Sequence, residues 1–378
     1  MTSCRRTPRV AVIGAGIAGA SCARTLSLAG CAVHVVDKSR GPGGRLATRR
    51  LEWLDPAGRH RTAKVDHGAP GFTARGADFR QFLASASPAG ALAPWTPTLS
   101  AGSRPLDDAG PLWVPTPDMP SLCRWLLQGV AATWSFAVDC LHPGPLGWQI
   151  EAAGSRLDGH FDAVVLALPP AQVAPLLAEH RSDWAQRASL ALTQPCWTLM
   201  GAAARSDKPF GWDLGRPEQG PLSWVMRHDG RPGREADAAA ALWVVHARAG
   251  WSRQHLEQAA DWVQAEMQCA LHDWLGQPLA WQHTVVHRWR YARPQAPVAA
   301  AASRCWWDAA RGLGVCGDFL SGTGVEGAWQ SARALCESVL LGAPSATLSP
   351  ISAFSDGLPQ RVPAGAACPS LLFIQPKE

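Results

Sequence analysis

Gly14-Ala15-Gly16-Ile17-Ala18-Gly19 is the segment on which the fold prediction for this chain rests. It has the pattern GxGxxG and lies between an apolar run, Val10 to Ile13, and a stretch of helical periodicity, Ile17 to Ala29. The first glycine permits a tight turn, the second lets a pyrophosphate approach the backbone, and the third lets helix and strand pack closely. A second apolar strand, Ala32 to Val36, ends at Asp37. The pattern predicts a strand–helix–strand unit that binds a dinucleotide, with Asp37 on the adenosine ribose.

A second glycine-rich segment follows directly, Lys38-Ser39-Arg40-Gly41-Pro42-Gly43-Gly44-Arg45. Its paired glycines permit another close approach of backbone and ligand, and the Arg45 guanidinium can bind two phosphate oxygens at once. A domain that binds only NAD has no need of a second phosphate contact here. The segment therefore favours FAD, and a basic surface loop without a ligand is the alternative.

The remaining periodicities predict the fold class α/β, a Rossmann-like FAD-binding domain with an inserted α+β substrate domain of antiparallel sheet and helices. Buried strands are expected at 161–168 and 314–318, with a helix over 325–341. Strands at 196–204, 222–226 and 242–247, a further segment at 280–291, and one helix over 252–275 with Ser252 as its N-cap indicate the second domain. The predicted boundaries are 9–72, 134–175 and 305–342 for the FAD domain, 73–133 and 176–304 for the substrate domain, and 343–378 for a flexible tail.

Composition excludes several classes of protein. The net charge is +5, but the arginines stand in short scattered runs rather than along one basic face, so no nucleic acid partner is expected. The 11 cysteines form no CxxC pair and no grouping with histidines, which predicts reduced thiols, no metal site and a cytoplasmic protein. No apolar run reaches the ~18 residues of a spanning helix, and we expect neither a membrane segment nor a cleaved signal. No nucleophile elbow of a hydrolase is present.

The order of motifs resembles the renalase-like branch of the flavin amine oxidase superfamily. The resemblance runs through most of residues 9–341 and includes Asp66-His67-Gly68-Ala69 and Cys316-Gly317-Asp318, which leads to Gly322-Thr323-Gly324-Val325-Glu326-Gly327-Ala328. It implies flavin chemistry with FAD as the cofactor. The implied FAD contacts are Gly14, Gly16, Ala18, Gly19, Asp37, Lys38, Gly44, Arg45, Pro70, Gly71, Gly317, Asp318, Gly324 and Val325.

Two of these implied contacts carry their own arguments. Pro70-Gly71 is less polar than the pair in the vertebrate enzyme, so contacts there are expected through the backbone. The helix that begins near Gly324-Val325 would direct the positive end of its dipole at the flavin and stabilise the anionic reduced ring. Ordinary packing of a C-terminal helix is the alternative.

The substrate prediction rests partly on what the chain lacks. Flavin amine oxidases resemble one another in a lysine near the flavin and a tyrosine cage, whereas this chain has only Lys38, Lys64, Lys208 and Lys377 and a single tyrosine, Tyr291. Tryptophan can replace tyrosine in such a cage, which keeps an amine substrate open. Hydride transfer from a dihydronicotinamide needs no general base. The resemblance implies oxidation of dihydronicotinamide dinucleotides, the isomers of NAD(P)H, with O2 as acceptor and H2O2 as product.

The best candidate for the substrate wall is His287-Arg288-Trp289-Arg290-Tyr291. On a strand, alternation would place the histidine, tryptophan and tyrosine on one face and the two arginines on the other, where they could meet a ribose-phosphate group. Aromatic core packing with solvated arginines is the alternative. His246 is interpreted as a core histidine. The competing functions are an FAD-dependent amine oxidase or polyene desaturase, an NAD(P)-dependent dehydrogenase, and a non-catalytic nucleotide-binding protein.

Overall fold

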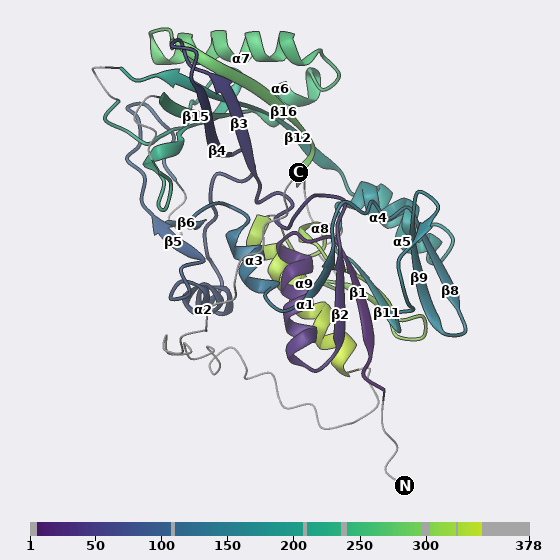
Figure 1. Ribbon diagram of the computed structural model, residues 1–378. Coiled ribbons are helices and arrows are strands. Elements are labelled where there is room, and N and C mark those ends of the chain that lie inside the picture. The colour runs from purple at the N-terminus through teal and green to yellow at the C-terminus, as the bar shows by residue number, and fades with distance from the viewer. Residues whose placement is uncertain are drawn as a thin grey trace, which may run out of the picture. The chain divides into compact units, whose positions relative to one another are not determined.

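A six-stranded sheet carries the glycine-rich segments (Figure 1). The computed structural model describes residues 6–106, 110–206, 210–235, 240–295, 303–322 and 324–341. The strands, in the order in which they lie in the sheet, are β17 (Trp306–Asp308), β18 (Leu313–Val315), β11 (Ala163–Leu166), β1 (Arg9–Ile13), β2 (Ala32–Val36) and β7 (Ala131–Thr133). All neighbours are parallel except β17 with β18, as a Rossmann-like domain requires.

Both faces of this sheet are covered, which is why its strands are nearly continuous runs of apolar residues. α1 (Ile17–Leu28) and α9 (Gly324–Leu341) lie side by side against it (Figure 1), although they come from opposite ends of the chain. Ile13 and Leu166 pack on the opposite face in a separate hydrophobic cluster. That cluster includes residues of α4 (Pro170–Leu177), α5 (Ser182–Ser189) and α8 (Asp318–Ser321), and of β8 (Cys140–Gly144) and β9 (Gly147–Ala152), which form a small sheet with β10 (Ser155–Arg156).

A five-stranded antiparallel sheet forms the second part of the fold. Its strands lie in the order β13 (Leu214–Gly215), β14 (Leu222–Arg227), β15 (Ala240–Ala247), β12 (Thr193–Ala204) and β16 (Trp281–Pro294). One face packs against α7 (Ala260–Leu275), and the other packs against the hairpin of β3 (Thr48–Leu54) and β4 (His60–Asp66). With the dinucleotide-binding sheet, this arrangement confirms the predicted fold class.

The remaining elements are short. They are α2 (Ala77–Ala86), β5 (Leu92–Trp95), β6 (Leu112–Pro115), α3 (Ser121–Leu126) and a single 3-10 turn, η1 (His228–Gly230). β5 and β6 pair as a hairpin, and α3 lies against α1.

The predicted helix over 252–275 is wrong in its first part. The chain forms α6 (Ala249–Gln254), leaves the helix, and begins α7 at Ala260. Ser252 is buried inside α6 rather than at an N-cap, and its hydroxyl accepts a 3.0 Å hydrogen bond from the backbone N–H of Trp197. A buried strand amide needs a partner, and the serine supplies it.

Two segments contact the sheet of the domain to which the sequence did not assign them. Residues 131–133, which fall in the predicted substrate domain, pair as β7 with β2 of the dinucleotide-binding sheet. The β3–β4 hairpin, which falls in the predicted FAD domain, packs its Leu51 and Trp53 against the five-stranded sheet. The predicted tail, 343–378, lies outside the described residues. Within the described part of the chain, no helix combines the length and apolarity needed to cross a bilayer.

The turn from β1 into α1 depends on two glycines in contact. Gly14 has φ +105°, in the region that favours glycine, and its N–H donates to the Val36 carbonyl at 2.8 Å. A Cβ atom on Gly19 would lie 1.8 Å from the Gly14 carbonyl oxygen. The first turn of α1 can therefore approach the end of β1 only without a side chain at Gly19.

We expect Gly19→Ala to lower the free energy of unfolding by about 1–3 kcal/mol or more, because the methyl group must displace backbone. Gly41→Ala is the matched control, since Gly41 lies in the neighbouring glycine-rich segment and a Cβ there meets nothing within 4 Å. Urea denaturation of both variants measures the difference. Equal stability of the two variants would contradict the close-approach argument.

Candidate functional site

The two glycine-rich segments meet at the carboxyl ends of β1 and β2. The backbone N–H of Gly43 donates to the Ala15 carbonyl at 2.9 Å, and a Cβ on Gly44 would lie 3.1 Å from the Gly16 Cα. The Asp37 carboxylate accepts a 2.6 Å hydrogen bond from the Ala15 N–H. Segments predicted separately thus meet at one place, at the edge of the sheet where such folds bind ligands.

Arg45 and Asp318, 273 residues apart in sequence, form a bidentate ion pair with distances of 2.8 and 2.9 Å. The Asp318 side chain is only 4% exposed, whereas that of Arg45 is 35% exposed. Arg45 also donates to the Ala292 carbonyl at the end of β16, at 3.1 Å. Arg45, predicted to bind the pyrophosphate, and Asp318, predicted to bind near the flavin, therefore touch each other. Part of the Arg45 guanidinium stays exposed.

Glu326, in the first turn of α9, anchors the start of this helix to the segment just before α2. Glu326 accepts hydrogen bonds of 2.8 Å from the backbone N–H groups of Arg75 and Gly76. Gly324 adopts φ +87°, and Val325 is buried one residue further on. Gly317, just before α8, donates its N–H to the Ser331 hydroxyl of α9 at 2.9 Å. The Gly317-Asp318 segment is thereby fixed against α9, while Thr323 of the same motif lies outside the described residues.

Two further predicted FAD contacts differ in their surroundings. Ala18 is buried in the first turn of α1, next to the glycine-rich loop. Lys38 is exposed immediately after Asp37.

Asp66 is a buried carboxylate bound by three cationic or imidazole side chains. Its Oδ2 lies 3.1 Å from Arg231, 2.6 Å from Arg234 and 3.2 Å from His228. Burial alone would raise the pKa of Asp66, but the contact with His228 and the two guanidinium charges hold it well below its usual range. One carboxylate faces two buried guanidinium groups, so the cluster carries excess positive charge.

This ionic cluster also positions the predicted Pro70-Gly71 contact. Arg231, whose side chain is 0% exposed, donates to the Pro70 carbonyl at 2.8 Å. Gly71 lies against the backbone of Trp113 and its neighbours. Sequence reasoning missed His228, Arg231 and Arg234. A buried aspartate requires a cation, but no local pattern says which of many arginines supplies it.

The predicted substrate wall lies beside this loop. The Trp289 Nε1–H donates to the His67 carbonyl at 3.0 Å, and the His67 ring centroid lies 5.1 Å from Trp289 and 4.8 Å from His287. Thr198 pairs with His287 on one side and with His246 on the other, which places these three side chains in one row across the sheet. His246, interpreted from the sequence as a core histidine, is buried and adjoins the wall.

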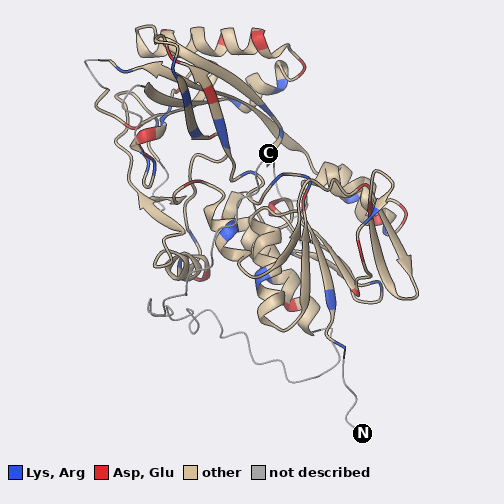
Figure 2. Ribbon diagram, in the orientation of Figure 1, with Lys and Arg blue, Asp and Glu red and all other residues tan. Residues whose placement is uncertain are grey.

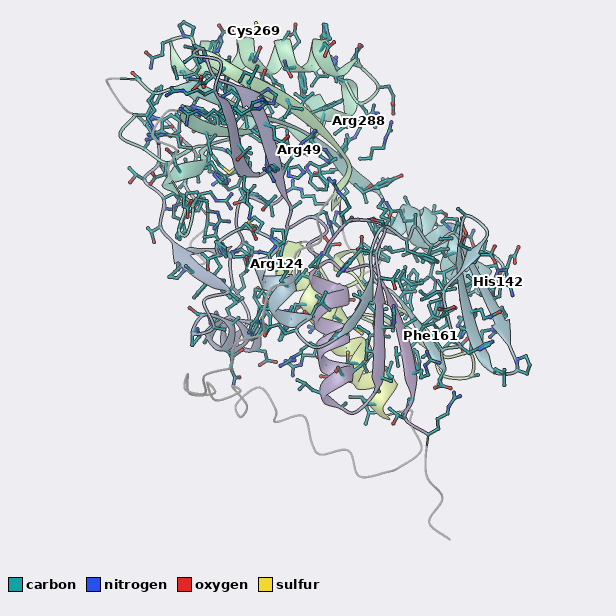
Figure 3. All side chains as sticks on the ribbon, viewed as in Figure 1. Arg49, Arg124, His142, Phe161, Cys269 and Arg288 are labelled. Carbon is teal, nitrogen blue, oxygen red and sulfur yellow. The ribbon has the colours of Figure 1, made fainter. Side chains whose placement is uncertain are left out.

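The arginines of the same strand lie on its other face. Arg288 and Arg290 bind Glu257, in the segment between α6 and α7, at 3.0 and 2.8 Å. Figure 3 shows Arg288 on the side of the sheet that carries α6. Tyr291 is partly buried further along β16. The strand thus alternates as predicted, and its arginines are occupied by a carboxylate.

The imidazoles of the wall are neutral at neutral pH. Burial lowers the pKa of His67 to about 3 and that of His246 to about 4, and it also lowers the pKa of His287. Lys64 lies 3.7 Å from Asp118, while Lys208 and Lys377 fall outside the described residues. The wall can therefore stack and orient a planar ring, and these histidines are not suited to accept a proton near pH 7.

Comparison with known proteins supports the same fold. Residues 12–86 match the family of NAD(P)-binding Rossmann-like domains. A protein of Exiguobacterium sp. 255-15 assigned as a protoporphyrinogen oxidase is 12% identical, with a TM-score of 0.65 over 89% of this chain and 99% of its own. An oxidoreductase from Methanosarcina mazei is 16% identical, with a TM-score of 0.54 over 87% of this chain and 100% of its own.

A putrescine oxidase double mutant, made to redesign cofactor binding, is 14% identical, with a TM-score of 0.54 over 89% of this chain and 100% of its own. Similarity at these identities concerns the fold. The chain thus has the two-part architecture of these oxidoreductases, a Rossmann-like dinucleotide-binding domain joined to an antiparallel sheet.

The low pKa of His246 makes stability depend on pH. An unfolded histidine, with its ordinary pKa of 6.5, gains a proton as the pH falls, while folded His246, with a pKa of about 4, stays neutral. Because the unfolded state then binds more protons, the free energy of unfolding decreases as the pH falls below 6.5. In His246→Gln we expect the loss between pH 7 and pH 5 to shrink by up to about 2 kcal/mol.

Urea denaturation at the two pH values measures this loss. His60→Gln, at an exposed histidine in the β3–β4 hairpin, is the matched control. The assignment is wrong if the pH dependence of wild type and His246→Gln is the same.

Proposed function

We propose that the protein is an FAD-dependent oxidoreductase, and the observation that carries this is the meeting of three predicted cofactor segments. The Gly14–Gly19 loop, the Gly43-Gly44-Arg45 segment and Gly317-Asp318 are far apart in sequence but contact one another through Gly16, Gly44 and the Arg45–Asp318 pair. A nucleotide shorter than FAD has no use for so extended a row of contacts.

The residues present fit this cofactor. Gly16 and Gly44, whose N–H groups donate to no backbone carbonyl within the described part of the chain, let a pyrophosphate approach the main chain, and Asp37 stands at the end of β2, where a ribose hydroxyl is bound in such folds. The exposed part of the Arg45 guanidinium, which also pairs with Asp318, would contact the phosphates. The flavin ring, which supplies the hydride-accepting chemistry when bound, is proposed to lie toward Gly71 and the start of α9.

Arg45→Ala should weaken FAD binding by about 1.5–3 kcal/mol, the value of a lost charge-assisted hydrogen bond. Arg40→Ala, in the same loop but at an exposed side chain, is the matched control. Titration of the apoprotein with FAD, followed by flavin fluorescence, gives the affinities. An unchanged affinity in Arg45→Ala would remove Arg45 from the cofactor site.

We further propose that the substrate is a dihydronicotinamide dinucleotide, oxidised in the renalase-like manner with O2 as acceptor and H2O2 as product. The neutral wall of His67, His287 and Trp289 supports it, because a hydride donor must be stacked and shielded from water rather than deprotonated. The Trp289–His67 hydrogen bond holds the indole in place. Orientation of the ring and exclusion of water are the protein's contribution to this reaction.

Amine oxidation is the second candidate, because a putrescine oxidase shares the fold. Against it stands the charge of the site. A cationic amine would approach the buried cluster of Asp66, Arg231 and Arg234, in which the guanidiniums outnumber the carboxylate. A polyene desaturase and an NAD(P)-dependent dehydrogenase have no specific observation in their favour.

Anaerobic mixing of the FAD-loaded protein with isomeric dihydronicotinamide dinucleotides, ordinary NADH, and putrescine distinguishes these functions. Loss of the flavin absorption band with a dinucleotide, and peroxide release after air is admitted, is the expected result. Bleaching by putrescine alone would replace the proposal with amine oxidation. A protein that takes up no FAD would refute both.

A further inference from the structure

Arg49 stands on the inner face of the β3–β4 hairpin, toward the substrate wall. Side chains alternate along β3, and Leu51 and Trp53 are buried against the five-stranded sheet. Arg49, two residues before Leu51, shares their face, and its partner on β4 is the fully buried Val65. Figure 3 labels Arg49 on this hairpin, and Figure 2 shows basic residues along it.

Arg50 takes the opposite face. It is exposed and binds Glu52 at 2.9 Å, two residues along the same face. The two adjacent arginines therefore differ in direction and in partner, although they share one strand. Among the residues that the structure describes, the Arg49 side chain forms no hydrogen bond or ion pair.

Arg49 lies near three imidazoles. Its charge acts on His67, His283 and His287, and together with burial it lowers the pKa of each of them. His283 stacks on Trp53, the residue that follows Leu51 on the inner face, with ring centroids 6.3 Å apart. The Trp53–His283 contact sets β3 against β16, and the alternation of side chains along β3 then directs Arg49 toward the histidine end of the wall.

Within the described site, no unpaired carboxylate is available to form an ion pair with the Arg49 guanidinium. Asp66 is already bound by two buried arginines, and Glu257 lies on the far face of β16 with Arg288 and Arg290. An exposed guanidinium beside a neutral aromatic wall is suited to a ligand that is aromatic at one end and anionic at the other.

We propose that Arg49 binds a phosphate group of the substrate while the oxidisable ring lies on the wall of His67, His287 and Trp289. The inference rests on the proposed function and adds a specificity-determining residue to it. Arg49 would select phosphorylated donors over neutral ones and would repel cationic amines.

The test compares Arg49→Gln with Arg50→Gln, after FAD content is shown to equal that of wild type. Two donors are used under anaerobic conditions, a dihydronicotinamide dinucleotide and the uncharged 1-methyl-dihydronicotinamide, which lacks phosphate. In Arg49→Gln the dissociation constant of the dinucleotide should rise by about 10- to 100-fold, the effect of losing a charged hydrogen bond. The constant for the neutral donor should not change, and Arg49→Lys should recover part of the loss.

Arg50→Gln should resemble wild type with both donors, because its partner is Glu52 on the outer face. Equal weakening of both donors in Arg49→Gln, or no weakening of either, overturns the inference. A fall in FAD retention in Arg49→Gln overturns it as well, since Arg49 would then belong to the cofactor site.

Failure of the proposed function is recognised separately. If no dihydronicotinamide bleaches the wild-type flavin, binding of ADP-ribose is measured instead by calorimetry on the FAD-loaded protein. Binding that is lost in Arg49→Gln and kept in Arg50→Gln retains the phosphate site and discards the reaction. Binding that is indifferent to Arg49 discards the phosphate site.

Discussion

The buried carboxylate of Asp66 joins the parts of the molecule that form the site. It ends β4, leads directly into the His67 to Gly71 loop, and binds Arg231 and Arg234, which follow β14 of the five-stranded sheet. Removing one partner from a buried ion pair costs about 3–5 kcal/mol, because the other charge is left without compensation. The position of the loop beside the wall therefore depends on this one group of charges.

A second constraint is the contact of backbone with backbone at the glycine loops. Gly14 with Gly19, and Gly16 with Gly44, approach so closely that a side chain at Gly19 or Gly44 would displace the main chain. The same absence of side chains leaves the main chain at Gly16 and Gly44 accessible at the sheet edge. Packing and ligand binding thus both require glycine at these positions, which explains why the motif can be recognised in a sequence.

The strands and helices of the dinucleotide-binding sheet were predictable because their signals are local. β1, α1, β2 and α9 lie within one or two residues of the predicted ranges. Ser252 was misinterpreted because a serine before a helical pattern is a common N-cap, while the buried Trp197 amide that it binds is 55 residues away. The alternation of His287 and Trp289 against Arg288 and Arg290 follows from the strand period alone.

Local chemistry in the sequence determined the dinucleotide fold and the residue types of its loops, since turns, close approaches and strand periods are encoded by neighbours in the chain. Tertiary structure alone decided which charges meet. Arg45 with Asp318, Asp66 with Arg231, and the direction of Arg49 depend on segments that come together only after folding. The physical reason is that an ion pair is specified by distance in space and by burial, and a chain with 35 lysines and arginines offers too many partners for sequence to choose among them.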